Sequence, residues 1–191
     1  QLTVPSNITI RHALCNIEQP VRTTENNGRR TISLELSDLP TLKQEPYARS
    51  LRERLPLAYF APEQFVYYGT KGSFTNWNEM GQWEYSLLQG RDLLPDHVKA
   101  KLHQLTDGLD SEREKVKRIY QYLGETTRYV AILLGIGGQQ PIPAEQVCKS
   151  GFGDCKGLTN YMQSMLKEIG IASNYTVIST TNRRLLPDFA S

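Results

Sequence analysis

The first third of the chain alternates between apolar and polar positions, a pattern typical of strands that bury one face. The alternation is clearest over residues 7–14 and 31–36, where several side chains are β-branched. Asn26-Asn27-Gly28 lies between these two segments, and Asn-Gly is a favoured sequence for a tight hairpin turn. We therefore expect two antiparallel strands joined near this turn.

Prolines interrupt the chain after the second of these segments. They occur at Pro40, Pro46, Pro56 and Pro62. Because proline cannot continue a helix, we expect extended chain here, with one further strand at residues 65–68. Residues 1–70 are accordingly predicted to be β-rich, and the pattern changes near Thr70.

Apolar side chains recur every three or four positions after Thr70, which is the spacing of one helix face. The first such segment covers residues 75–89 and has its apolar positions at Trp77, Met80, Trp83 and Leu87. An aromatic stripe of this kind can bind carbohydrate, but we favour packing against the core. Residues 71–95 are therefore predicted to form a connecting helix.

A further helix is predicted around two histidines. Its buried stripe consists of Val98, Leu102 and Leu105. His97 and His103 fall outside this stripe, so we expect both imidazoles on a solvated helix face rather than in a catalytic site. His12 lies in the alternating strand segment and gives no better candidate.

Ser111-Glu112-Arg113-Glu114 predicts the start of another helix, because a serine followed three residues later by a glutamate forms a capping box. The apolar positions of that helix are Val116, Ile119, Tyr120 and Leu123. Residues 129–134 are expected to follow as a short strand or extended segment, and residues 135–138 as a glycine-rich loop.

Gly153-Asp154-Cys155-Lys156-Gly157 is the most informative stretch for function, because it places a cysteine where a loop ends and an apolar-periodic helix begins. The helix dipole is positive there, which favours a thiolate over a thiol. Asp154 is expected to cap the helix and Gly170 to end it. Lys156 either supports the thiolate or is simply an exposed lysine of the first turn. The alternative for Cys155 is an inert buried thiol.

Three segments resemble the bacterial transglutaminase-like superfamily, in which a G-x-C or G-D-C-K loop presents the catalytic cysteine. They are YVAILLGIGGQQP (129–141), PAEQV (143–147) and GFGDCKGL (151–158). Weaker similarity covers residues 62–65, 71–74 and 76–77. That region looks like the junction to the N-terminal β-domain, itself of unknown function, in exported Bacteroidetes-type members. The resemblance implies that Cys155 is the nucleophile of a papain-like fold.

A cysteine nucleophile needs an imidazole, and a carboxylate or amide that orients this imidazole. In the family these partners follow the cysteine on later strands, whereas all three histidines of this sequence precede Cys155. After it comes a predicted strand at residues 175–178, but no histidine. We therefore expect a truncated fragment of a longer exported protein, inactive as given. We favour this over a full-length inactive relative, because a sheet without its central strands would expose a long edge.

Donors for an oxyanion are expected upstream of the cysteine, besides its own backbone amide. Gln139 and Gln140 carry amide side chains in the loop before it, and similarity to papain-like enzymes makes either a candidate. Tyr129 is a third candidate, since aromatic residues serve this role in some relatives. The plainer interpretation is that the loop amides face water.

No metal or cofactor is expected. Cys148 and Cys155 are separated by six residues, which is not a zinc spacing, and no second pair of soft ligands lies nearby. A disulfide between these two cysteines would silence the nucleophile, so its only role would be regulatory. With three cysteines in the chain, at least one thiol stays unpaired.

Composition excludes several classes of function. The 191 residues allow one large domain or one and a half small ones, with enough apolar content for a sizeable core. The formal net charge is only +2 and the basic residues are interspersed with acidic ones, so we expect no nucleic-acid partner. No segment is as long and apolar as the roughly 20 residues of a membrane span.

These patterns and the resemblance together predict an α+β chain in three parts. Residues 1–70 are the C-terminal part of a β-sandwich, 71–95 a connecting helix, and 96–191 the helical front half of a transglutaminase-like core. The resemblance implies acyl transfer through a thioester at Cys155 on a protein or peptide substrate, with hydrolysis favoured over cross-linking. Whether the chain itself is an enzyme is left open.

The alternative function is a non-catalytic binding module of the cell envelope with a vestigial cysteine. The resemblance also implies an exported protein of the periplasm or cell envelope. An exposed sheet edge predicts a homodimer or strand exchange between copies.

Overall fold

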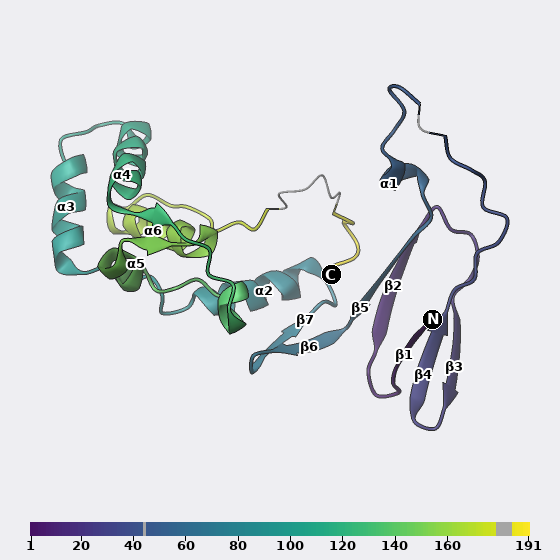
Figure 1. Ribbon diagram of the computed structural model, residues 1–191. Coiled ribbons are helices and arrows are strands. Elements are labelled where there is room, and N and C mark those ends of the chain that lie inside the picture. Colours follow the sequence, from purple (N-terminus) through teal and green to yellow (C-terminus); the bar gives the residue numbers. More distant parts are fainter. Residues whose placement is uncertain (44, 179–184) are drawn as a thin grey trace. The chain divides into compact units, whose positions relative to one another are not determined.

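The computed structural model describes residues 1–43, 45–178 and 185–191, and Figure 1 shows their path coloured along the chain. The chain divides into two compact units. The first unit holds Gln1–Met80 together with Leu185–Ser191, and the second holds Gly81–Arg184. Helices and strands are both present, so the prediction of an α+β chain is confirmed. The finer division at residues 70 and 95 stays a prediction.

Antiparallel strands make up most of the first unit. In chain order they are β1 Leu2–Pro5, β2 Ile10–Cys15, β3 Arg22–Asn26, β4 Arg29–Ser33, β5 Leu57–Pro62, β6 Gln64–Tyr67 and β7 Thr70–Ser73. They pair in the orders β1-β4-β3, β2-β5 and β6-β7. The strand expected at 65–68 is therefore present as β6. A short helix, α1 at Leu51–Arg54, lies where only extended chain was expected.

The hairpin turn at Asn27-Gly28 joins β3 to β4, so the expected pairing of 7–14 with 31–36 is wrong. Asn27 and Gly28 have φ angles of 50° and 70°, as the tight turn of a two-residue hairpin requires. β2 pairs with β5 instead. Sequence analysis missed β3 because all its residues are exposed, which leaves no apolar alternation to detect.

The last residues of the described chain pack into the first unit. The indole Nε1 of Trp77 donates a hydrogen bond to the backbone oxygen of Leu186 at 2.9 Å. Phe189 and Ala190 are buried, and the Arg11 guanidinium lies 4.9 Å from the centre of the Phe189 ring. Arg11 Nη1 also donates to the Ala190 oxygen at 3.4 Å. One buried ring and two hydrogen bonds to carbonyls therefore anchor this segment.

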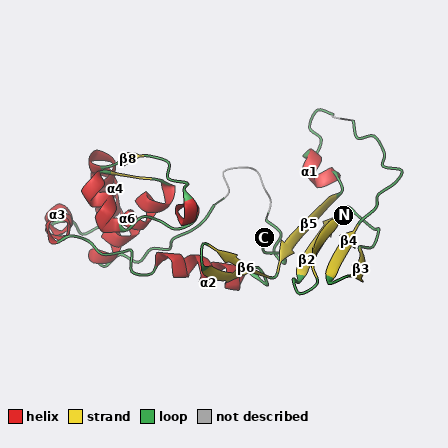
Figure 2. Ribbon diagram, turned by 60° about the horizontal axis from the view of Figure 1, so that its bottom comes forward, coloured by secondary structure: helices red, strands yellow, loops and turns green. Residues whose placement is uncertain are grey.

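Helices dominate the second unit, and Figure 2 shows them in red. They are α2 Trp77–Leu88, which begins in the first unit, α3 Asp96–Thr106, α4 Glu112–Thr126, the 3₁₀ helix η1 Gly135–Gly138, α5 Ala144–Ser150 and α6 Cys155–Glu168. Two short strands, β8 Arg128–Tyr129 and β9 Phe152–Gly153, pair in parallel. α6 packs against α3, α4 and α5. Within the described ranges, no helix has the length and apolarity needed to cross a membrane.

The apolar core of the second unit lies among α3, α4, α5 and α6. Its buried members are Leu94, Val98, Leu102, Ile119, Leu123, Ala144, Val147, Tyr161, Met165 and Leu166. The stripe predicted for α3 is largely confirmed, because Val98 and Leu102 are fully buried and Leu105 is half-buried. In α2, Trp83 and Leu87 are buried as expected.

Three details of the second unit differ from the prediction. α4 follows Ser111, but the serine side chain makes no capping hydrogen bond. Tyr120 is 69% exposed, because it lies about 100° around the helix from the buried Ile119; Tyr122 packs on the core instead. The expected loop at Gly135–Gly138 is a 3₁₀ helix.

We predict that Gly157→Ala destabilises the fold, whereas Gly124→Ala does not. Both glycines lie in helices, but a Cβ at Gly157 would lie 2.8 Å from Ile142 Cγ1, and a Cβ at Gly124 would meet nothing within 4 Å. Overpacking costs about 1–3 kcal/mol, whereas replacing glycine by alanine in a helix gains about 0.5–1 kcal/mol. Urea unfolding measures both changes. Equal stability of the two variants would contradict the close contact with Ile142.

Candidate active site

Cys155 is the first residue of α6, and its side chain is exposed. The preceding Asp154 is the N-cap: its Oδ1 accepts a hydrogen bond from the Gly157 N–H at 2.9 Å. This confirms the predicted cap. The positive end of the helix dipole lies at Cys155, which favours a thiolate there.

Two short parallel strands lead to the cysteine. Tyr129 of β8 lies in register with Gly153 of β9, and the Val130 N–H donates to the Gly153 oxygen at 3.0 Å. Tyr129 is 61% exposed. The start of the predicted extended segment 129–134 is thus a strand that runs alongside the backbone entering α6.

The carboxylate of Asp154 is buried, and Lys156 balances its charge. Lys156 Nζ pairs with Asp154 Oδ2, and the two side chains are 13% and 3% exposed. The interpretation of Lys156 as an exposed lysine of the first turn is therefore wrong. An unpaired carboxylate beside Cys155 would repel a thiolate. Because Lys156 offsets that charge, Asp154 opposes the effect of the helix dipole at the sulfur less strongly.

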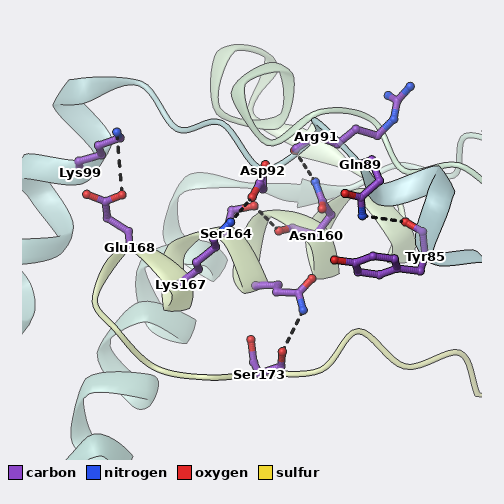
Figure 3. A network of polar contacts seen from close by, with 11 residues as sticks. Tyr85, Gln89, Arg91, Asp92, Lys99, Asn160, Ser164, Lys167, Glu168 and Ser173 are labelled. Atoms are coloured by element: carbon purple, nitrogen blue, oxygen red, sulfur yellow. Dashed lines mark hydrogen bonds and ion pairs between the residues drawn. The ribbon is translucent and has the colours of Figure 1, made fainter. Parts of the chain in front are cut away.

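Polar contacts hold α6 in place, as Figure 3 shows. Asn160 Nδ2 donates to the backbone oxygen of Arg91 at 2.7 Å, and Ser164 Oγ donates to the Asn160 oxygen at 2.7 Å. The Arg91 oxygen also accepts a hydrogen bond from the Ala144 N–H at 2.8 Å. One carbonyl therefore ties the start of α5 to the middle of the helix that carries Cys155.

The other end of α6 is equally well defined. Lys167 Nζ donates to Asp92 Oδ2 at 2.6 Å. Gly170 has a φ angle of 75°, and its N–H donates to the Lys167 oxygen at 3.1 Å. The Ile171 N–H donates to the Leu166 oxygen at 2.9 Å, which completes a Schellman motif. The predicted stop at Gly170 is confirmed.

The two glutamines expected as oxyanion donors follow η1. Gln139 is exposed, and Gln140 Nε2 donates to the backbone oxygen of Leu87 at 3.3 Å. That bond uses one of the two amide hydrogens of Gln140. A role in an oxyanion hole stays a prediction for Gln139, Gln140 and Tyr129 alike.

Comparison with known proteins identifies the cysteine-bearing part of the chain. Residues 99–184 match the family model of the transglutaminase-like superfamily. The segment that carries Cys155 is therefore similar to that superfamily. The match includes the loop that presents Cys155 and the whole of α6.

A solved structure has a related fold. It is the crystal structure of a putative protease from Parabacteroides distasonis, with a TM-score of 0.56 and 18% sequence identity. The similarity covers 88% of this chain but only 31% of that protein, so this chain spans less than a third of it. No curated protein matches the chain.

Two titratable side chains near the transglutaminase-like cysteine were not predicted from the sequence. Burial first, and then the negative charges of Glu84, Cys155 and Asp154, raise the pKa of Tyr175 to about 12. Burial also raises the pKa of Glu84. Tyr175 therefore lies within electrostatic reach of the sulfur. Neither residue belongs to a sequence motif, so no local signal could have indicated this proximity.

The strand predicted over residues 175–178 is not formed. Residues 171–178 have no regular secondary structure, and Val177 and Ile178 are exposed. An apolar run of this kind becomes a strand only when a neighbouring strand pairs with it, and no strand of the described chain does so.

The structure places the three histidines against other groups. His97 Nε2 lies 3.6 Å from Cys148 Sγ, and His103 Nδ1 lies 3.0 Å from Asp107 Oδ1. His12 belongs to β2 in the first unit. His97 and His103 are exposed as predicted, but the solvated-face interpretation missed the contact between His97 and a thiol.

We predict that Lys156→Met slows alkylation of Cys155 by iodoacetamide near pH 7, by roughly threefold to tenfold. The physical reason is that Asp154 becomes an unpaired carboxylate beside the sulfur. Lys156→Arg keeps the charge and should keep the rate. Mass spectrometry of the cysteine peptides gives the rates, with Cys15 as the reference thiol. Alkylation of a folded Lys156→Met protein at the wild-type rate would exclude this electrostatic role.

Glu84→Gln is predicted to raise the free energy of unfolding more near pH 7 than near pH 4. Burial raises the pKa of Glu84, so the folded state holds this proton more tightly than the unfolded state. Stability is therefore lost as the pH rises through the unfolded and then the folded pKa, and a neutral amide avoids that loss. Urea unfolding at both pH values measures the difference. Glu125→Gln, at an exposed position of α4, is the matched control; an equal effect in both variants would refute the prediction.

Proposed function

We propose that the chain forms a thioester at Cys155 and thereby acts on amide bonds of a protein or peptide, as a peptidase. The observation that carries this proposal is the exposed thiol at the capped start of α6, within a transglutaminase-like segment. The buried pair of Asp154 and Lys156 supports it, because this pair removes a charge that would oppose the thiolate.

The reaction begins with attack of the Cys155 thiolate on the carbonyl carbon of the amide. The C–N bond breaks as sulfur takes the acyl group, the amine leaves with a proton, and water then hydrolyses the thioester to a carboxylic acid. Charge that develops on the carbonyl oxygen needs N–H or O–H donors. We assign these to the Cys155 backbone amide and to a side chain among Gln139, Gln140 and Tyr129.

An amine in place of water would give cross-linking instead of hydrolysis. We favour hydrolysis because the name of the structurally similar Parabacteroides distasonis protein points to proteolysis. The exported, cell-envelope location and the pairing of two copies through a sheet edge stay predictions, the first from the resemblance and the second from strand chemistry.

Turnover requires an imidazole, and we infer that neither His97 nor His103 supplies it. His97 contacts Cys148, and His103 contacts Asp107. Without such an imidazole, Cys155 should acquire an acyl group and release it slowly.

We predict that p-nitrophenyl acetate acetylates Cys155 in a burst of about one equivalent per chain, followed by slow hydrolysis. Nitrophenolate absorbance gives the burst, and mass spectrometry locates the acetyl group. Added imidazole should speed the slow phase by supplying a base. The same imidazole should then allow cleavage of a fluorogenic peptide mixture.

Two variants control this experiment. Cys155→Ser should lose the burst, and Cys15→Ser should keep it. If Cys155 and Cys15 are acetylated at equal rates, the nucleophile assignment fails and the chain is better described as a non-catalytic binding module with a vestigial cysteine. If imidazole speeds hydrolysis equally in Cys155→Ser, it acts on the ester directly. The inference that hydrolysis of the Cys155 thioester lacks a base then fails.

A further inference from the structure

A second thiol of the transglutaminase-like segment lies against an imidazole. The Sγ of Cys148, in α5, lies 3.6 Å from the Nε2 of His97, at the start of α3. This separation is within hydrogen-bonding distance for sulfur. His97 is exposed and Cys148 is half-buried, so small molecules in solution can reach the pair.

A buried phenol completes the surroundings of Cys148. Tyr161 of α6 is 1% exposed and forms hydrogen bonds with Cys148 and with Tyr122 of α4. Burial, and then the negative charge of Cys148, raise the pKa of Tyr161, which keeps its hydroxyl protonated and able to donate. Cys148 is therefore faced by His97 from α3, Tyr122 from α4 and Tyr161 from α6.

These neighbours can assist a reaction of the sulfur. The imidazole is placed to accept the thiol proton when the sulfur attacks an electrophile, and the Tyr161 hydroxyl lies beside the sulfur. The arrangement differs from that at Cys155, where the start of a helix favours the thiolate. Cys148 lies in the second half of α5, towards the negative end of the helix dipole, which opposes a thiolate, so its reactivity depends on His97.

We propose that Cys148 is a site of oxidation by hydroperoxides, with His97 as its proton acceptor and donor. The thiolate attacks one peroxide oxygen, and the O–O bond breaks as the S–O bond forms. Sulfur loses two electrons and becomes a sulfenic acid, while the peroxide is reduced to water or an alcohol that takes the proton of the His97 imidazolium. The step does not involve acyl transfer at Cys155.

Dimedone labelling of the intact chain during exposure to hydrogen peroxide at neutral pH tests this proposal, with each cysteine peptide followed by mass spectrometry. Cys148 should be labelled at least about fivefold faster than Cys15, the half-buried thiol of the first unit. His97→Gln should slow labelling of Cys148 by a similar factor. His103→Gln, exposed on the same helix, should leave it unchanged.

The proposal is overturned if Cys148 is labelled no faster than Cys15, or if His97→Gln behaves like His103→Gln. Because His97 is exposed, its replacement should not disturb the fold, and an unchanged alkylation rate of Cys155 in the same sample confirms that α6 is intact. Failure of the proposed peptidase activity would leave this result unaffected, since the two chemistries are read at different cysteines.

Discussion

The buried carboxylate of Asp154 is the constraint on which the candidate site depends. A charged side chain with 3% exposure is stable only where other groups replace the lost water. The Gly157 N–H and the Lys156 ammonium are those groups. The first fixes the residue at which α6 begins, and hence the position of Cys155. The second offsets the negative charge of Asp154, which would otherwise oppose the helix dipole at the sulfur.

Packing in the core of the second unit fixes the position of the first turn of α6. α6 packs against α3, α4 and α5. The backbone oxygen of Arg91 accepts hydrogen bonds from Asn160 Nδ2, in α6, and from the N–H of Ala144, the first residue of α5. Gly157 has no Cβ, which lets Ile142 approach the first turn closely. Movement of Cys155 would therefore require repacking of buried side chains. Acyl transfer depends on this kind of preorganisation, because the nucleophile and the oxyanion donors must keep their geometry as charge develops.

Local signals explain which features the sequence could predict. The helices of the second unit repeat their apolar residues on one face, and the cap at Asp154 and the stop at Gly170 are encoded within a few residues of each helix end. Which strands pair is not determined by local sequence in this way, since the turn at Asn27-Gly28 is compatible with any two flanking strands. In the site, Cys155 follows from its motif. The approach of Tyr175 depends on tertiary structure and leaves no trace in nearby sequence.

The two thiols that we propose to be reactive lie in different surroundings, and α6 contributes to both. At Cys155 the contribution is the start of the helix itself, whereas at Cys148 it is the hydroxyl of Tyr161, beside the imidazole of His97. An imidazole that holds the proton of one thiol cannot serve the other at the same time. Cys155 therefore relies on the helix for its charge and on another group for proton transfer.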